Sequence, residues 1–266
     1  MEKTQFYSDS WALILGASSG FGAAVSKALA AAGMNIIGVH LDRKLTLDNV
    51  KKLEEDIKAM GRKCSFFNVN ASDEIKRKEI LDTIRAECSG KIHVLFHSLA
   101  FGSLLPFIEN DPKARLSKAQ MDMTLDVMAH SLVYWAQDLA AENFFKKGAS
   151  VYAMTSAGSS RVWKSYGAVS AAKSALESHC RQLALELAPR GVRVNALLAG
   201  VTDTPALRKI PGNEGMLVVA KNRNPMGRLT TPEDIAQATV ALTLPGLSFM
   251  TGNVINIDGG ENVVES

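Results

Sequence analysis

The sequence predicts one α/β domain, a doubly wound parallel sheet, spanning all of residues 1–266. Short apolar runs alternate along the chain with longer amphipathic stretches, a pattern typical of strands and helices around a parallel sheet. A glycine-rich turn follows the first apolar run directly. With 266 residues, of which 47% are hydrophobic, the chain suits a single large domain with a sizeable core.

Composition argues against several function classes. The net charge is only +3 and no long basic tract occurs, so we expect no nucleic-acid partner. No apolar run reaches the length of a membrane span, and the first residues lack the apolar core of a signal peptide. Three isolated cysteines (Cys64, Cys88 and Cys180) are typical of reduced thiols, not of metal ligands. We therefore expect a cytoplasmic protein without a bound metal or membrane partner.

The first strand is expected at residues 11–15, and the glycine-rich turn leads from it into a helix at 23–32. Gly16 permits the tight turn, Gly20 lets the backbone approach a pyrophosphate, and Gly22 lets helix and strand pack closely. The amides at the helix N-terminus then face the phosphates. Strand, turn and helix together predict a Rossmann-type dinucleotide site formed by Gly16, Ser18, Ser19, Gly20, Phe21 and Gly22.

The second strand, residues 35–39, bears on the choice of nucleotide. An acidic residue near its end would bind the ribose 2′-hydroxyl of NADH, but His40 occupies the expected place. Arg43 and Lys44 suit the 2′-phosphate of NADPH, whereas Asp42 favours the opposite choice. We predict NADPH, with NADH as the less favoured cofactor.

The remaining elements continue the alternation. We expect Asn68 and Val69, at the end of the third strand, to touch the adenine. Residues 106–116 read as a loop, and residues 204–228, rich in Gly and Pro, are predicted to form a mobile lid. The expected strands are 63–69, 92–96, 149–155, 192–197 and 254–258, and the expected helices are 47–60, 74–87, 118–145, 165–187 and 232–244.

A tyrosine and a lysine stand near the start of the predicted 165–187 helix. A helix turns about 100° per residue, so Tyr166 and Lys173 should share one face, two turns apart. A nearby ammonium should lower the pKa of the phenol and make it a proton donor. The alternative is an exposed lysine and a half-buried tyrosine that share a face by chance.

The chain resembles the short-chain dehydrogenase/reductase superfamily over almost its whole length. The resemblance lies in Gly16-x3-Gly20-x-Gly22, Asn195-Ala196 before Ala199-Gly200, the stretch from Asn224 to Asp234, and Ile257-Asp258-Gly259-Gly260. Most members carry Tyr-x3-Lys, whereas Val169 takes that tyrosine's place here and the spacing is Tyr-x6-Lys. That spacing, and the stretch from His97 to Gly102, are similar to the enoyl-acyl-carrier-protein reductases.

Several residues depart from the usual enoyl reductase pattern. The chain keeps the full glycine motif, Ser156 replaces a second tyrosine, and Met128 stands where the ketone-reducing branch keeps an asparagine. Ser156 is also where that branch keeps its catalytic serine. A minority NADPH-dependent enoyl reductase type is similar to this mixture, and a short-chain ketone, hydroxysteroid or 3-ketoacyl oxidoreductase is the alternative. The third hypothesis is a protein that binds the nucleotide as a sensor and catalyses no reaction.

The resemblance implies roles for individual residues. Tyr166 would bond the thioester carbonyl oxygen, Lys173 would bind the nicotinamide ribose, and Ser156 would either be a second donor or cap the strand. Ser98 and Ala100 would line the ribose side, and Thr202 and Thr204 would hold the carboxamide and diphosphate. The implied substrate is an enoyl thioester on acyl carrier protein or CoA, and the implied assembly is a homotetramer built partly on the tyrosine-bearing helix.

Overall fold

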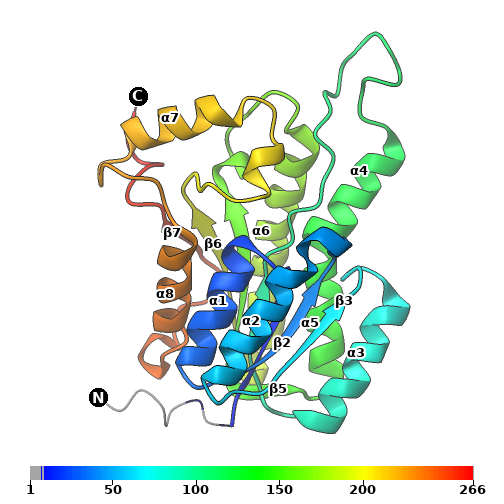
Figure 1. The fold of residues 1–266 in the computed structure, drawn as a ribbon, viewed down its shortest axis with the longest axis vertical. Coiled ribbons are helices and arrows are strands. Elements are labelled where there is room, and N and C mark those ends of the chain that lie inside the picture. The colour runs from blue at the N-terminus through cyan, green and yellow to red at the C-terminus, as the bar shows by residue number, and fades with distance from the viewer. Residues whose placement is uncertain (1–6, 8, 266) are drawn as a thin grey trace.

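The computed structural model describes residue 7 and residues 9–265, and it contains one seven-stranded sheet (Figure 1). Every neighbouring pair of strands is parallel, in the order β3-β2-β1-β4-β5-β6-β7, which confirms the predicted doubly wound class. The strands are β1 (Trp11–Leu15), β2 (Asn35–His40), β3 (Cys64–Asn68), β4 (Ile92–His97), β5 (Phe145–Ser156), β6 (Arg193–Ala199) and β7 (Val254–Ile257).

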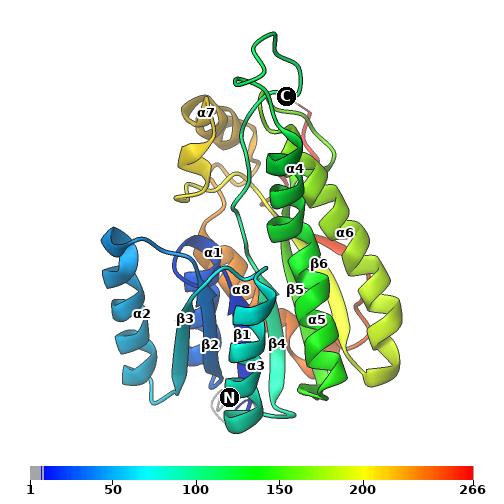
Figure 2. The same ribbon diagram turned by 90° about the vertical axis from the view of Figure 1, so that its right-hand side faces the viewer.

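Helices cover both faces of the sheet, as Figure 2 shows. One layer holds α1 (Gly20–Ala31), α2 (Leu47–Ala59) and α8 (Pro232–Leu242). The opposite layer holds α3 (Glu74–Glu87), α4 (Lys118–Leu125), α5 (Ser131–Ala141) and α6 (Gly167–Leu187). Because both faces are covered, a central strand can be apolar along its whole length: all five residues of β1 are apolar and buried.

Short 3-10 turns connect several of these elements, and side chains fix where helices begin. Ser117 and Gln120 form a capping box at the start of α4, and Thr231 and Asp234 form another at the start of α8. Such caps satisfy amides that the first helical turn leaves without partners. The 3-10 turns are Lys44–Thr46, Ala157–Ser159, Ala188–Arg190, Leu207–Lys209 and Pro245–Leu247.

The helix expected at 118–145 is interrupted and shorter than predicted. A π-helical turn, Asp126–His130, separates α4 from α5, and α5 ends at Ala141. Asn143 then adopts φ 53°, and the buried Phe144 returns its amide to the Leu139 carbonyl. Phe145, predicted to be helical, is already the first residue of β5. The apolar pattern of the sequence does not change at this turn, so the pattern alone predicted a helix that was too long. The turn depends on the burial of Phe144 in the core, which is a tertiary contact.

Two segments rise above the carboxyl ends of the strands. Residues 204–228 contain the turn Leu207–Lys209 and α7 (Asn213–Arg223), so they are more regular than their glycine and proline content predicted. The expected loop at 106–116 projects at the same end of the molecule (Figure 2). None of the helices in the described part of the chain combines the length and apolar character that crossing a bilayer requires.

Candidate active site

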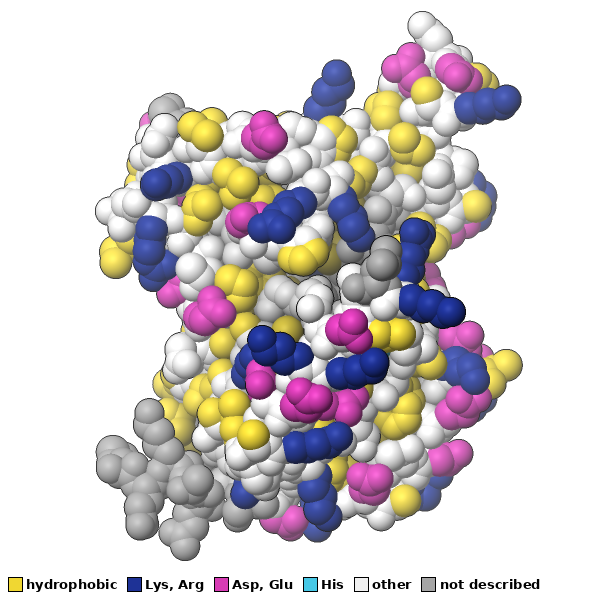
Figure 3. Space-filling view, viewed as in Figure 1, with side chains coloured by type: hydrophobic (Ala, Val, Ile, Leu, Met, Phe, Trp, Pro, Cys, Tyr) yellow, Lys and Arg dark blue, Asp and Glu magenta, His cyan; other side chains and the backbone are white. Residues whose placement is uncertain are grey.

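A large cavity of about 1070 Å³ lies at the carboxyl ends of the strands. Figure 3 shows the molecular surface hollowed across its middle, below α7 and above α1 and α2. The strand order reverses between β1 and β4, and ligands of doubly wound sheets bind at such a reversal. Residues from the glycine-rich turn, the ends of β2, β4, β5 and β6, the start of α6, and α7 all line this cavity.

The glycine-rich turn has the close contacts that its glycines were expected to permit. Gly16 has φ 90°, and a Cβ there would overlap the Ser98 carbonyl; a Cβ on Gly22 would overlap the Gly16 carbonyl. Ser19 precedes α1 and makes no side-chain capping bond. The first amides of α1 are therefore left for a ligand, and a helix N-terminus with free amides favours an anion. These residues fit the diphosphate of a dinucleotide.

Beyond β2, the Asp42 carboxylate is held by protein donors. His40 Nδ1 lies 2.9 Å from Asp42 Oδ2, and Thr46 Oγ1 donates to Asp42 Oδ1 at 2.6 Å. Burial would raise the pKa of Asp42, but hydrogen bonds from Ser18, Thr46 and His40 outweigh it and lower the pKa. Asp42 is therefore a carboxylate at the wall of the cavity, with its oxygens already engaged.

Of the cofactor residues predicted near this end, Arg43 and Val69 line the cavity, but Lys44 and Asn68 do not. The Asn68 side chain instead accepts from the Asp42 amide at 2.8 Å and donates to the Asp42 carbonyl at 3.0 Å. It therefore braces the loop after β2, and the contact of Asn68 with the adenine stays a prediction. Lys44 begins the 3-10 turn Lys44–Thr46 and does not line the cavity.

Tyr166 lies just before α6, not within it as predicted. Ser165 has φ 61° and Tyr166 has φ −98° and ψ 2°, so the helix begins at Gly167. The Tyr166 ring packs on Gly158, where a Cβ would lie 2.6 Å from the ring. Burial raises the pKa of the Tyr166 phenol, and a hydrogen bond with the Ser156 side chain opposes this only in part. The phenol therefore stays protonated at neutral pH.

Lys173 occupies the floor of the cavity and does not act on Tyr166 as expected. Its side chain is buried, and Nζ donates to the Met154 carbonyl at 2.7 Å. Burial lowers the pKa of the Lys173 ammonium to about 8. The ammonium is not among the groups that shift the pKa of the Tyr166 phenol. The predicted lowering of the tyrosine pKa by this cation is therefore wrong, because Lys173 is directed at the backbone of β5.

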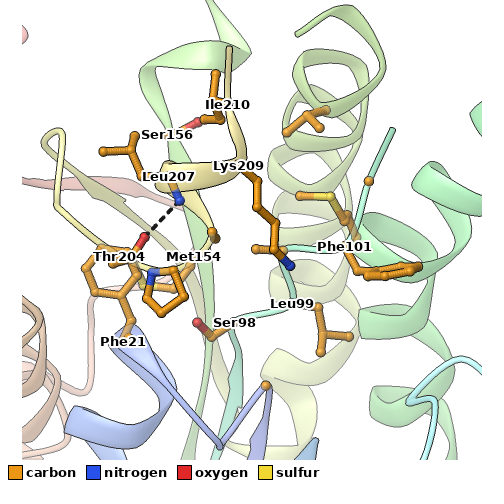
Figure 4. Close-up of a pocket in the computed structure, with 18 of the residues that line it drawn as sticks. Phe21, Ser98, Leu99, Phe101, Met154, Ser156, Thr204, Leu207, Lys209 and Ile210 are labelled. Carbon is orange, nitrogen blue, oxygen red and sulfur yellow. Dashed lines mark hydrogen bonds between the residues drawn. The ribbon is translucent and has the colours of Figure 1, made fainter. Parts of the chain in front are cut away.

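The other predicted residues meet at the same cavity. Ser156 Oγ accepts from the Gly158 amide at 3.3 Å and lies against the phenol. The Leu207 amide donates to Thr204 Oγ1 at 3.2 Å (Figure 4). Of the predicted set, Gly16, Ser18, Ser19, Gly20, Phe21, Arg43, Val69, Ser98, Ala100, Ser156, Tyr166, Lys173, Thr202 and Thr204 line the cavity, whereas Gly22, Lys44 and Asn68 do not.

Apolar side chains form the wall opposite the glycine-rich turn. Phe101 and Trp163 line the cavity and are 54% and 41% exposed, so they are wall residues and not core. The buried Met128 and Val169 line the cavity as well, and each lies close to Gly102. This wall suits an apolar substrate. Met216 and Val219 on α7 also line it; their helical spacing in the 213–223 stretch was a usable signal.

One buried ion pair at the cavity could not be predicted from the sequence. Arg223 of α7 donates to Glu261 Oε1 at 3.0 Å, and Glu261 Oε2 accepts from the Val201 amide at 2.9 Å. Glu261 is 1% exposed. The pair joins α7 to the loop that carries Thr202. Its members are 38 residues apart, and nothing in their local sequence links them.

His97 is excluded from the candidate chemistry, as the sequence indicated. Its ring is fully buried, bonds to Ser131 Oγ at 2.9 Å and does not line the cavity. Burial lowers the pKa of His97 to about 3, so the ring is neutral at working pH. Within residue 7 and residues 9–265, no group of three His, Cys, Asp or Glu side chains is arranged to hold a metal ion.

Comparisons with known proteins agree with this arrangement. A family model described as "Enoyl-(Acyl carrier protein) reductase" matches residues 16–262. The chain is 26% identical to the NADH-dependent enoyl-[acyl-carrier-protein] reductase FabI of Bacillus cereus over 243 residues, 90% of this chain and 91% of that protein. It is also 27% identical to the 3-oxoacyl-[acyl-carrier-protein] reductase FabG of Thermotoga maritima over 255 residues, 93% and 96% of the two chains.

Among solved structures, the chain is similar to FabI from Candidatus Liberibacter asiaticus. The TM-score is 0.84 at 23% sequence identity, and the match covers 99% of each chain. At that identity the likeness establishes the fold. The two kinds of relative named above reduce different bonds, so the choice between them depends on the cavity itself.

Proposed function

We propose that this protein reduces the double bond of trans-2-enoyl thioesters in fatty acid biosynthesis. The chain belongs to the short-chain dehydrogenase/reductase superfamily, in the enoyl-(acyl carrier protein) reductase family, and is thus a nicotinamide-dinucleotide oxidoreductase. The observation that carries this proposal is the position of Tyr166. It is the one tyrosine among the described residues lining the cavity, and Val169 fills the place from which most members present theirs.

The displaced tyrosine suits an enolate. In enoyl reduction the hydride adds to Cβ, and negative charge collects on the thioester oxygen, three bonds from Cβ, until the enolate takes a proton from solvent at Cα. When bound, the nicotinamide supplies the hydride. A protonated Tyr166, held by Ser156 and packed on Gly158, can donate a hydrogen bond to that oxygen without giving up its proton. The raised pKa of the phenol supports this donor role.

Lys173 and the backbone around it would position the nicotinamide half. One N–H of the ammonium is taken by the Met154 carbonyl, which leaves two for ribose hydroxyls. Ser98 and Ala100 would line the ribose, and Thr202 and Thr204 would hold the carboxamide and diphosphate. The diphosphate seat would consist of Gly16, Ser18, Ser19, Gly20 and Phe21, with Val69 beside the adenine.

We propose NADPH as the preferred dinucleotide, with NADH as the alternative. Arg43 lines the cavity and has no bonded side-chain partner among the described residues, so it is available to a 2′-phosphate. The Asp42 carboxylate is already engaged by His40, Ser18 and Thr46, which reduces its repulsion of that phosphate. The Bacillus relative is described as an NADH enzyme, so the ratio of Michaelis constants for the two nucleotides must be measured.

The substrate side of the proposal rests on the apolar wall and on residues 204–228. We propose that this segment acts as a lid, because its residues Leu207, Ile210 and Met216 line the same cavity as Phe101 and Trp163. The acyl group of an enoyl thioester, on acyl carrier protein or CoA, would occupy that space. A homotetramer in the cytoplasm is the assembly and setting that we infer from the family, and light scattering tests the former.

Ketone reduction, as in a 3-ketoacyl, short-chain ketone or hydroxysteroid oxidoreductase, is the second candidate. The hydrogen bond between Ser156 and Tyr166 favours it, because a serine and a tyrosine together can polarise a ketone. The Thermotoga relative is described as a 3-oxoacyl reductase. In this case the Ser156 hydroxyl would bond the substrate oxygen directly, and the Ser156→Ala substitution would abolish most of the activity.

Nucleotide oxidation with crotonyl thioester, set beside acetoacetyl thioester, separates the two functions. We expect turnover of crotonyl thioester, a loss of at least a hundredfold in kcat for Tyr166→Phe, and a loss of less than tenfold for Ser156→Ala. Turnover of acetoacetyl thioester alone, abolished by Ser156→Ala, would establish ketone reduction instead. Tight nucleotide binding with no turnover of either thioester would indicate a nucleotide sensor.

A further inference from the structure

The positively charged side chains that line the cavity differ in whether the protein already satisfies them. Arg223 is paired with Glu261, Arg161 Nη2 donates to the Asn262 carbonyl at 3.0 Å, and Lys173 donates to Met154. Arg43 and Lys209 also line the cavity, and neither side chain has a hydrogen bond or ion pair with any residue that the structure describes. Arg43 lies beyond β2, so among the described residues Lys209 is the unpaired cation that the 204–228 segment contributes to the cavity lining.

Lys209 is held in a turn that directs it into the cavity. The turn Leu207–Lys209 is fixed at its start by the bond from the Leu207 amide to Thr204 Oγ1. Figure 4 shows the Lys209 side chain extending from this turn toward the loop that carries Ser98, Leu99 and Phe101. Lys209 is exposed at the cavity wall, and its ammonium, which no carboxylate neutralises, is available to an anionic ligand.

Arg208, the preceding residue, differs from Lys209 in both respects. Its Nε and Nη2 donate to the two carboxylate oxygens of Asp203 at 2.8 and 2.9 Å. Arg208 is not among the residues that line the cavity. These adjacent cations are both exposed, but Arg208 is neutralised by Asp203 and does not line the cavity, whereas Lys209 is unpaired and lines it. This makes Arg208 a matched control for Lys209.

The turn that carries Lys209 begins beside the seat expected for a diphosphate. A Cβ on Gly20 would lie 3.5 Å from Thr204 Cγ2, so the 204–228 segment starts in contact with the glycine-rich turn. The free amides of α1 make that turn an anion site. Lys209 enters the same cavity from the opposite side. A phosphate between them would be bound by amides on one side and an ammonium on the other.

We propose that Lys209 binds a phosphate group of the ligand and so ties the 204–228 segment to the loaded cavity. Two phosphates fit this chemistry: the diphosphate of the dinucleotide, and the phosphate of a pantetheine arm on the thioester. The first source requires only that the protein binds a dinucleotide, whereas the second rests on the proposed enoyl reductase function. The contact would form on binding, so that ligand affinity depends on the charge at position 209.

The first arm of the test measures binding without turnover. Isothermal titration with NADPH and with ADP-ribose should give dissociation constants about tenfold higher for Lys209→Met than for the parent protein. Lys209→Arg should restore most of the affinity, and Arg208→Gln should leave it unchanged. The parent should also lose affinity with added salt more steeply than Lys209→Met. Since no substrate is present, this arm is independent of the reaction catalysed.

The second arm measures the Michaelis constants of two thioesters at saturating nucleotide. If the phosphate is that of pantetheine, Lys209→Met should raise the constant for crotonyl-CoA several-fold but not that for crotonyl-N-acetylcysteamine, which has no phosphate. A change in either arm supports the proposal and identifies the source. Unchanged values in both arms, or an equal effect of Arg208→Gln, would overturn it.

Discussion

Replacing Lys173 by methionine should make the nucleotide-free protein more stable at pH 7 and also inactive. Lys173 is 6% exposed, and burial lowers the pKa of its ammonium from 10.5 to about 8. Each tenfold change in the dissociation constant is worth 1.36 kcal/mol, so holding this charge in the folded protein at pH 7 costs about 3 kcal/mol. Loss of the hydrogen bond to the Met154 carbonyl destabilises the variant by about 1 kcal/mol. The net gain should be about 2 kcal/mol.

The stabilisation by Lys173→Met should decrease as the pH rises. The folded protein holds the Lys173 proton less tightly than the unfolded chain, so between about pH 8 and pH 10.5 the unfolded chain binds more protons. The stability of the parent protein therefore rises with pH through that window, and the cost of the charge falls from about 3 kcal/mol at pH 7 to about 1 kcal/mol at pH 9.5. The advantage of Lys173→Met should shrink by the same amount.

Urea unfolding at pH 7 and at pH 9.5, followed by circular dichroism, measures both effects. Lys113→Met, which removes an exposed lysine from the projecting loop, is the control and should show neither. A Lys173→Met variant that is less stable than the parent at pH 7, or whose advantage does not change with pH, would refute the account of Lys173 as a buried charge.

Other substitutions test the remaining parts of the site. The rate at saturating substrate should fall above about pH 8 as Lys173 loses its proton, and a flat profile to pH 10 would contradict its role. Gly158→Ala should lower kcat at least tenfold with little change in nucleotide affinity, because the added methyl displaces Tyr166; calorimetry separates the two. Glu261→Gln should cost about 3 kcal/mol in urea unfolding, since it leaves Arg223 unpaired. Asp42→Asn should lower the Michaelis constant for NADPH relative to NADH several-fold, and equal changes for both would show that Asp42 does not discriminate.

The fold and the close packing of the glycine-rich turn could be predicted because their signals are local. A buried parallel strand is apolar throughout, as in β1, and the glycine-rich turn needs glycine for reasons visible in the backbone: Gly16 has a positive φ, and Gly22 touches the Gly16 carbonyl. Five consecutive buried residues and three spaced glycines are enough to place one end of the cavity.

The electrostatics of the site could not be predicted in the same way. Helical spacing placed Tyr166 and Lys173 near one another, but it could not show that Ser165 adopts a positive φ, or that the ammonium bonds the β5 backbone. The pKa of the phenol depends on how deeply Gly158 and its neighbours bury it, a tertiary property. The hydrogen bonds of the Asn68 side chain to the Asp42 backbone could not be predicted for a similar reason, since they join residues 26 positions apart.

The most direct test of enoyl reduction is the position of the transferred hydrogen. The protein should be given crotonyl and acetoacetyl thioesters together with dinucleotide deuterated at the transferring position, and the products examined by nuclear magnetic resonance. The position of Tyr166 predicts butyryl thioester with one deuterium on C3, and no labelled alcohol. Deuterium on the carbinol carbon of 3-hydroxybutyryl thioester, with crotonyl thioester left intact, would contradict it.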